Sequence, residues 1–150
     1  MADFDWRISV AEVREPGPFS SLPGVDRLLL LVEGDAMGLV VDGVAEPASR
    51  ERALAFRGES EVVCASLPSG PTVDLNVMTR RGRFTASLEV RPAEAVWSSS
   101  LPGACVVVVP LRDGVTADGE RLGPLDVAFV DESVALRGPA MVARIVIVPA

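Results

Sequence analysis

Turn-forming residues recur about every ten residues along the chain, and this spacing is the strongest constraint on its fold. Breaks such as Pro23-Gly24, Asp42-Gly43 and Pro102-Gly103 separate short segments rich in Val, Ile and Leu. Such segments are typical of β-strands. The predicted strands are Trp6–Val13, Arg27–Glu33, Gly38–Asp42, Glu61–Leu67, Val73–Met78, Ala86–Arg91, Cys105–Val109, Val127–Val130 and Met141–Val148.

Helical periodicity is weak throughout the sequence. No stretch of a dozen residues repeats its apolar positions every 3.6 residues, although Pro47–Ala55 has enough Ala, Glu and Arg for one short helical turn. Many short strands separated by turns favour an all-β barrel or sandwich.

Two parts of the chain follow a similar order of segments. Leu28–Val32 precedes glycine-rich turns and Phe56–Glu59, and Val106–Val109 precedes similar turns and Leu125–Phe129. The separation of about 75 residues predicts two copies of one β unit. We expect them to span roughly residues 1–83 and 84–150 of a single domain, because no linker separates them.

Charge and hydropathy exclude several classes of function. The 150 residues carry a formal net charge of -7, which disfavours attraction to nucleic acid or to anionic lipid. The longest apolar runs, Leu28–Val32 and Cys105–Val109, are far shorter than the roughly 20 residues that cross a bilayer. The acidic start of the sequence has no apolar run behind it, so we expect a cytoplasmic protein.

The absence of histidine, tyrosine and lysine restricts the available chemistry. All 14 cationic side chains are arginines, and no side chain has an unperturbed pKa near neutrality. A lysine Schiff base is excluded, and zinc, copper or iron sites would lack imidazole. Cys64 and Cys105 lie in apolar segments without a C-x-x-C spacing, so both are expected to be buried free thiols. We therefore predict no metal and no cofactor.

Three segments together resemble one family. They are Trp6-Arg7-Ile8-Ser9, then Gly17-Pro18-Phe19-Ser20 running to Pro23-Gly24-Val25-Asp26-Arg27 with Glu33-Gly34, and Asp74-Leu75-Asn76-Val77-Met78-Thr79-Arg80-Arg81. This combination is similar to the HutD/Ves family of cupin-fold proteins. The resemblance covers about residues 4–83. It implies a double-barrel, RmlC-like cupin (a bicupin) and a link to histidine utilisation, but it implies no established catalytic activity. Metal-dependent cupins use two histidines and a glutamate, and this sequence has no histidine.

The segment from Asp74 to Met78 alternates polar and apolar residues. A strand would place Asp74, Asn76 and Met78 on one face. If that face points into a barrel, Asn76 must bond to a ligand, a water or another side chain. The alternative turns the face to solvent, with Met78 covering an edge.

Arginines are the candidate anion contacts, because their planar fork matches a carboxylate. Arg7 alternates with Trp6, and it either binds a ligand or pairs with a surface acid. Trp6 packs in the core or at a rim, or else forms a ligand platform. Arg27 is either a pocket cation or the partner of a residue on another strand.

The remaining candidates lie in a loop and at a strand end. Ser20 either contacts a ligand or caps its own turn. Arg80 lies either in a solvated hairpin turn or at the mouth of a pocket.

Together these residues predict a metal-free pocket that binds a small acidic metabolite. The candidate ligand-binding residues are Trp6, Arg7, Ser20, Arg27, Asn76, Met78 and Arg80. Two other functions stay open: a metal-free isomerase or hydrolase of an amino-acid breakdown intermediate, and a stress-related interaction protein without a small ligand. We expect no nucleic-acid or membrane partner, and both a monomer and a homodimer remain compatible with the sequence.

Overall fold

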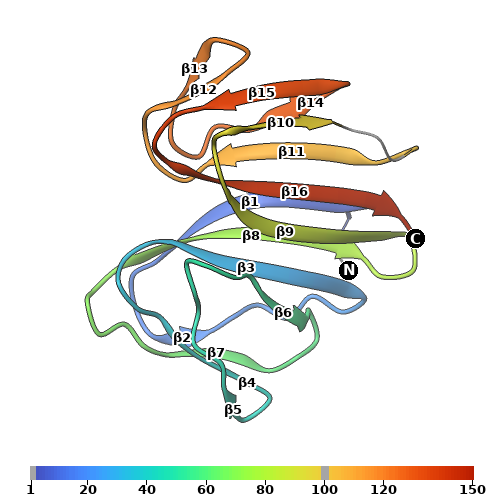
Figure 1. Cartoon of the computed structure of the whole chain (residues 1–150). Coiled ribbons are helices and arrows are strands. Elements are labelled where there is room, and N and C mark those ends of the chain that lie inside the picture. Colours follow the sequence, from blue (N-terminus) through green and yellow to red (C-terminus); the bar gives the residue numbers. More distant parts are fainter. Residues whose placement is uncertain (1–2, 99–101) are drawn as a thin grey trace. The chain divides into compact units, whose positions relative to one another are not determined.

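All regular secondary structure that the computed structural model describes, in residues 3–98 and 102–150, is β-strand (Figure 1). Each predicted strand is confirmed, with ends that differ by at most two residues. The all-β prediction is therefore confirmed. The sequence pattern missed seven further strands, which are short and lack a long alternating run: β2 (Gly17–Pro18), β5 (Val44–Ala45), β6 (Leu54–Arg57), β10 (Ala95–Ser98), β12 (Val115–Ala117), β13 (Glu120–Leu122) and β15 (Ser133–Arg137).

The helical turn expected for residues 47–55 is wrong. This segment forms bends and then enters β6. Its backbone bonds outside the segment: Ala48 N–H donates to the Met37 carbonyl at 3.1 Å, and the Ser49 carbonyl accepts from Leu31 at 2.9 Å. In a helix the Ser49 carbonyl would accept from a residue four positions later, so its hydrogen bond to Leu31 competes with helix formation and the local helix propensity is overridden.

The chain divides into two compact units, Met1–Thr85 with Ala150, and Ala86–Pro149. Unit 1 contains two four-stranded antiparallel sheets. The first has the order β1-β8-β3-β6, built from β1 (Trp6–Val13), β8 (Thr72–Arg80), β3 (Val25–Glu33) and β6. The second has the order β2-β7-β4-β5, with β7 (Val62–Ser66) and β4 (Gly38–Val41) at its centre.

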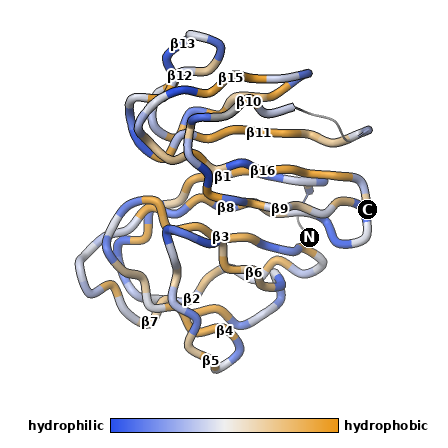
Figure 2. Tube along the Cα trace, viewed as in Figure 1, coloured by the Kyte–Doolittle hydropathy of each residue, from blue (hydrophilic) through white to orange (hydrophobic). Residues whose placement is uncertain are grey.

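The core of unit 1 joins its two sheets. Leu29, Leu31 and Phe56 from the first sheet form one buried cluster with Leu39 and Val62 from the second. Hydrophobic stretches colour β4, and they alternate with hydrophilic ones along β3 (Figure 2). Burial of this apolar surface is the main term that holds the two sheets together.

Unit 2 repeats the strand order of unit 1. Its first sheet has the order β9-β16-β11-β14, with β9 (Phe84–Pro92), β16 (Met141–Pro149), β11 (Cys105–Pro110) and β14 (Ala128–Val130). Its second sheet has the order β10-β15-β12-β13. Each strand of unit 2 thus has a counterpart eight strands earlier. Val106, Val108, Val142 and Val146 dominate its separate core.

Both cysteines are free. Cys64 is buried in the core of unit 1, and Cys105 is half-buried rather than fully buried. Burial raises the pKa of both thiols above the usual range, so neither is an activated nucleophile.

No helix among the described residues is long and apolar enough to span a bilayer.

Candidate functional site

A pocket of about 420 Å³ lies in unit 1, against the inner face of the β1-β8-β3 sheet. Strand register fixes which residues share this face. Asn76 of β8 lies between Ser9 of β1 and Leu29 of β3, and Asp74 lies two residues along on the same side. The polar face predicted for this strand therefore points inward, into the pocket, and not to solvent.

Arg27 places a cationic group inside the protein. Its side chain is only 7% exposed, and its guanidinium carbon lies 5.6 Å from the Phe19 ring centroid and 5.0 Å from that of Phe56. Stacking on aromatic faces stabilises a guanidinium, which is more weakly hydrated than an ammonium group. Burial lowers the pKa of Arg27, and the nearby Asp74 charge partly offsets this.

The hydrogen-bonding capacity of Arg27 is only partly used. Its Nη2 donates to Asn76 Oδ1 at 3.2 Å, and its Nε is buried without a hydrogen-bond partner among the described residues. A guanidinium has five N–H donors, and a buried donor without a partner is costly. The arrangement therefore suits a ligand that brings hydrogen-bond acceptors.

Asp74 is the buried acid of the pocket and is 1% exposed. Asn76 Nδ2 donates to Asp74 Oδ1 at 2.5 Å, so Asn76 lies between the carboxyl group and the guanidinium of Arg27. Burial raises the pKa of Asp74 to about 6, although the Asn76 hydrogen bond and the Arg27 charge oppose the rise. The carboxyl group therefore changes charge close to physiological pH.

Three other predicted residues also line this pocket: Arg7, Ser20 and Met78. Arg7 and Met78 are direct neighbours in the β1-β8 register. Arg7 is exposed, and within the described part of the chain it has neither a hydrogen bond nor an ion pair. Its guanidinium can therefore reach a ligand at the pocket mouth without breaking an existing contact.

Two predicted residues lie elsewhere. Trp6 pairs with Thr79 and is on the opposite face of β1 from Arg7, so it does not line the pocket. Arg80 lies at the end of β8, where its Nε and Nη2 donate to the carbonyl oxygen of Phe4 at 3.1 and 2.9 Å. Phe4 does line the pocket, so Arg80 positions one of its walls.

The loop that carries Phe19 and Ser20 is fixed by the backbone of unit 1. Phe19 N–H donates to Val62 O at 2.8 Å, and Leu22 N–H donates to Gly58 O at 2.7 Å. A Cβ at Gly58 would come within 2.1 Å of the Leu22 carbonyl oxygen. Only glycine permits this close approach, which holds the pocket wall in place.

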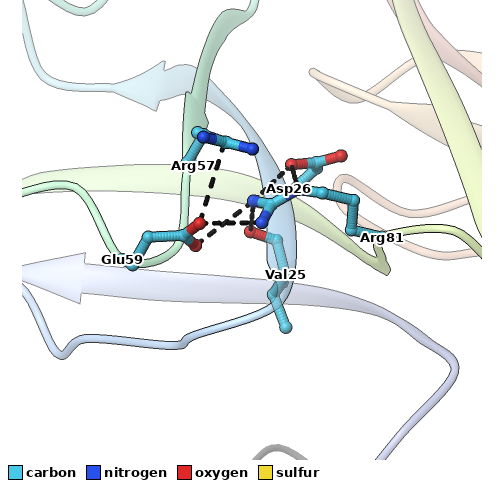
Figure 3. A network of polar contacts seen from close by, with 5 residues as sticks. All are labelled: Val25, Asp26, Arg57, Glu59 and Arg81. Carbon is cyan, nitrogen blue, oxygen red and sulfur yellow. Dashed lines mark hydrogen bonds and ion pairs between the residues drawn. The ribbon is translucent and has the colours of Figure 1, made fainter.

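Arg81 is structural rather than part of the pocket. It binds Asp26 Oδ1 through Nε at 2.8 Å and contacts both carboxylate oxygens of Glu59 (Figure 3). Arg57 also contacts Glu59, at 3.7 Å. These cations hold the pKa of Glu59 down at about 2, with the Arg81 hydrogen bond as the largest cause. Asp26 and Arg27 are adjacent in β3, so their side chains face opposite sides of the sheet.

Sequence reasoning missed three residues of the site: Asp74, Phe19 and Phe56. The alternation of the strand had already placed Asp74 on the Asn76 face, so that signal was present. The two rings gave no such signal, because their stacking on Arg27 depends on how β6 and the loop after β2 meet β3.

The residues do not fit a cupin metal centre. The sequence contains no histidine. Within residues 3–98 and 102–150, no three Cys, Asp or Glu side chains gather closely enough to hold a metal ion.

Two antiparallel two-sheet units with this strand order, and a pocket on the inner face of one of them, define a cupin-fold protein. The cupin 2 conserved barrel domain protein from Leptotrichia buccalis matches all of this chain with a TM-score of 0.59 at 10% identity. The HutD family model matches residues 1–144, so the chain belongs to the HutD family.

Solved structures and curated proteins agree with this assignment. The structure of HutD from Pseudomonas fluorescens SBW25 has a TM-score of 0.85 and 30% identity, covering 98% of this chain and 80% of that one. Protein Ves of Citrobacter koseri is 37% identical over 71% of this chain and 56% of its own length. The "Uncharacterized 21.2 kDa protein in hutC 3'region" of Pseudomonas putida is 39% identical over 57% of this chain and 45% of its own length. The chain spans about half the length of these curated relatives.

Proposed function

We propose that the pocket in unit 1 binds a small acidic metabolite, with Arg27 as the main contact for its carboxylate. The observation that carries this proposal is a guanidinium that is largely buried, lines a pocket and forms only one hydrogen bond within the described residues. A carboxylate supplies acceptors in the planar geometry of the guanidinium fork. Arg7 at the mouth adds a second positive charge, and Ser20 adds a hydroxyl group that can bond to the ligand.

Asn76 orients the site from within. Its amide oxygen accepts from Arg27 while its amide nitrogen donates to Asp74, which fixes the guanidinium plane relative to the pocket. A fixed donor array costs less ordering entropy on binding than a mobile one. The amide therefore acts as a positioning group for the cation.

The test is a thermal-shift and calorimetric titration with succinate, glutarate and pyruvate, and with neutral succinamide as the control ligand. A ligand that binds only the native state raises its stability by RT ln(1 + [L]/Kd). We expect at least one of the acids to raise the melting temperature, and succinamide to leave it unchanged.

Two variants make this test specific. Arg7→Ala removes an exposed cation from the pocket mouth, so it should fold normally and weaken acid binding several-fold. Arg52→Ala, which removes an exposed arginine outside the pocket, is the matched control and should bind as the wild type does. If Arg7→Ala binds acids as tightly as the Arg52→Ala control, or if no acid binds, the proposal fails.

Acid binding should also depend on the ionisation of Asp74. Below its pKa of about 6 this carboxyl group is neutral, which removes a negative charge beside the ligand. Pyruvate stays ionised throughout this range, so its affinity should rise as the pH falls from 7.5 to 5.5. Asp74→Asn should abolish that dependence while it retains binding.

A second candidate function rests on the same carboxyl group. A buried acid with a pKa near 6 in a pocket has the properties of a general base, as in a metal-free isomerase or hydrolase of an amino-acid breakdown intermediate. An activity lost in Asp74→Asn, with acid binding retained, would support it. Kinship with HutD and with the hutC-region protein supports a role in histidine or amino-acid utilisation for either function.

A further inference from the structure

A second pocket, of about 440 Å³, lies entirely on unit 2. It is lined by residues of β9, β10 and β16, together with the turn between β9 and β10. An adjacent hollow of about 490 Å³ shares Glu94 and Val96 with it. Val96 is 74% exposed, so the shared rim presents an apolar surface to solvent.

Arg144 is an unexpected residue on the inner face of β16. Val142 and Val146, two residues away on either side, both belong to the core of unit 2. Their alternation places Arg144 on the same face, where it pairs with Val108 of β11. A charged side chain at such a position needs either a structural partner or a ligand.

The described part of the chain gives Arg144 an aromatic partner but no acceptor. Its guanidinium carbon lies 5.9 Å from the Trp97 ring centroid, and no described residue forms a hydrogen bond or an ion pair with it. Trp97 itself packs against the core. The indole thus supports the guanidinium from one side and leaves its N–H groups available to the pocket.

The other charges of this pocket divide into a paired set and a free one. Arg91 donates to Glu89 Oε2 through Nε at 3.0 Å and Nη2 at 2.8 Å, so these two charges neutralise each other. Glu94 is exposed and has no hydrogen bond or ion pair within the described residues. The pocket therefore offers one free cation, Arg144, and one free anion, Glu94, among the residues described.

The second pocket lies against counterparts of three elements at the first pocket, although its guanidinium is on β16, the counterpart of β8, whereas Arg27 is on β3. β9, β16 and β10 are the counterparts of β1, β8 and β2 in strand order. In unit 1 the edge strand carries Arg7, and the buried guanidinium stacks on Phe19, which follows β2. In unit 2 the edge strand carries Arg91, and the guanidinium stacks on Trp97 of β10.

From this arrangement we infer that unit 2 holds a second ligand site, specific for a small zwitterion such as a free α-amino acid. Arg144 binds the carboxylate, Glu94 binds the ammonium group, and Val96 contacts an apolar side chain. A ligand with only one of the two charges satisfies one free group and leaves the other without a partner, so it binds less tightly. All residues of this site belong to unit 2.

The experiment uses L-leucine as the zwitterion, 4-methylpentanoate as the matched anion and L-leucinamide as the matched cation. Trp97 fluorescence, recorded in a Trp6→Phe background, reports binding next to Arg144 because these are the two tryptophans of the chain. We expect a saturable change with L-leucine, and at least tenfold weaker binding of the other two probes.

Variants assign the two charges. Arg144→Leu, which extends the apolar face of β16, and Glu94→Gln, at an exposed position, should each weaken L-leucine binding at least tenfold. The control variant Glu120→Gln, also exposed but outside the pocket, should bind as the parent does, as should Arg7→Ala in unit 1. Equal binding of L-leucine and 4-methylpentanoate, no binding of L-leucine, or unchanged binding in Glu94→Gln would overturn the inference.

Discussion

The stability of the protein should depend on pH through Asp74 in the direction opposite to that of a typical surface carboxylate. Its pKa is about 6 in the folded protein, against an ordinary value of 3.8, because burial penalises the charged form. Between these two values the folded state binds a proton that the unfolded state does not. The contribution of Asp74 to the unfolding free energy therefore rises as the pH falls through 6, and the rise is complete below 3.8.

The magnitude follows from the two pKa values. The full shift corresponds to about 3 kcal/mol, at 1.36 kcal/mol per pH unit. Between pH 7.5 and pH 4.5 the wild type should gain about 2 kcal/mol from this group alone. Asp74→Asn removes the titration but keeps an oxygen that can accept from Asn76. The unfolding free energy of Asp74→Asn minus that of the wild type should thus be about 2 kcal/mol larger at pH 7.5 than at pH 4.5.

Urea unfolding followed by circular dichroism at both pH values measures this difference, because other carboxylates contribute equally to the two proteins. Asp113→Asn is the control. Arg121 lowers the pKa of the exposed Asp113 below its ordinary value of 3.8, so the contribution of Asp113 to stability is lost only as the pH falls below 3.8, and this variant should differ from the wild type by nearly the same amount at pH 7.5 and at pH 4.5. A wild-type to Asp74→Asn difference that is the same at both pH values would refute the reasoning about burial.

Two further predictions concern the supports of the pocket. Gly58→Ala forces a Cβ against the Leu22 carbonyl, so it should cost about 1–3 kcal/mol in unfolding free energy and weaken acid binding; Gly17→Ala, which meets nothing within 4 Å, should do neither in the same assays. Arg81→Gln should lower the urea midpoint at pH 7 by removing the partner of Glu59. That deficit should become smaller as the pH falls from 4.5 toward 2, because Glu59 then becomes protonated in the wild type as well. A deficit of undiminished size near pH 2 would contradict the ion-pair explanation.

The fold was largely predictable because each long strand carries its own local signal. The runs that became β3 and β11 are apolar, and the turns between strands contain glycine at positive φ, as at Gly24 and Gly43. The short strands β2, β5 and β13 carry no such pattern, since two or three residues cannot show a period. They exist because a neighbouring strand offers hydrogen bonds, which is information outside their own sequence.

The site was predictable only where a single strand defines it. Alternation within β8 put Asn76 and Met78 on one face, and the structure places that face in the pocket. The sequence could not decide whether Arg27 was buried, because that depends on two rings from distant segments. It also did not predict the pocket of unit 2, since Arg144 resembles an ordinary polar break in an apolar strand until Trp97 is seen beside it.

The position of Asn76 explains how unit 1 can bury both Asp74 and Arg27 without a direct ion pair between them. A direct contact between Asp74 and Arg27 would use the N–H groups that a carboxylate ligand needs, and it would lower the pKa of the acid strongly. With the amide between them, the guanidinium keeps an unpartnered Nε, and the carboxyl group keeps a pKa near 6. Asn76→Leu should therefore remove the hydrogen bonds of Asn76 to Arg27 and Asp74 and destabilise both charged groups. Asn76→Gln keeps an amide donor and acceptor, so it should preserve more of the acid binding than Asn76→Leu does.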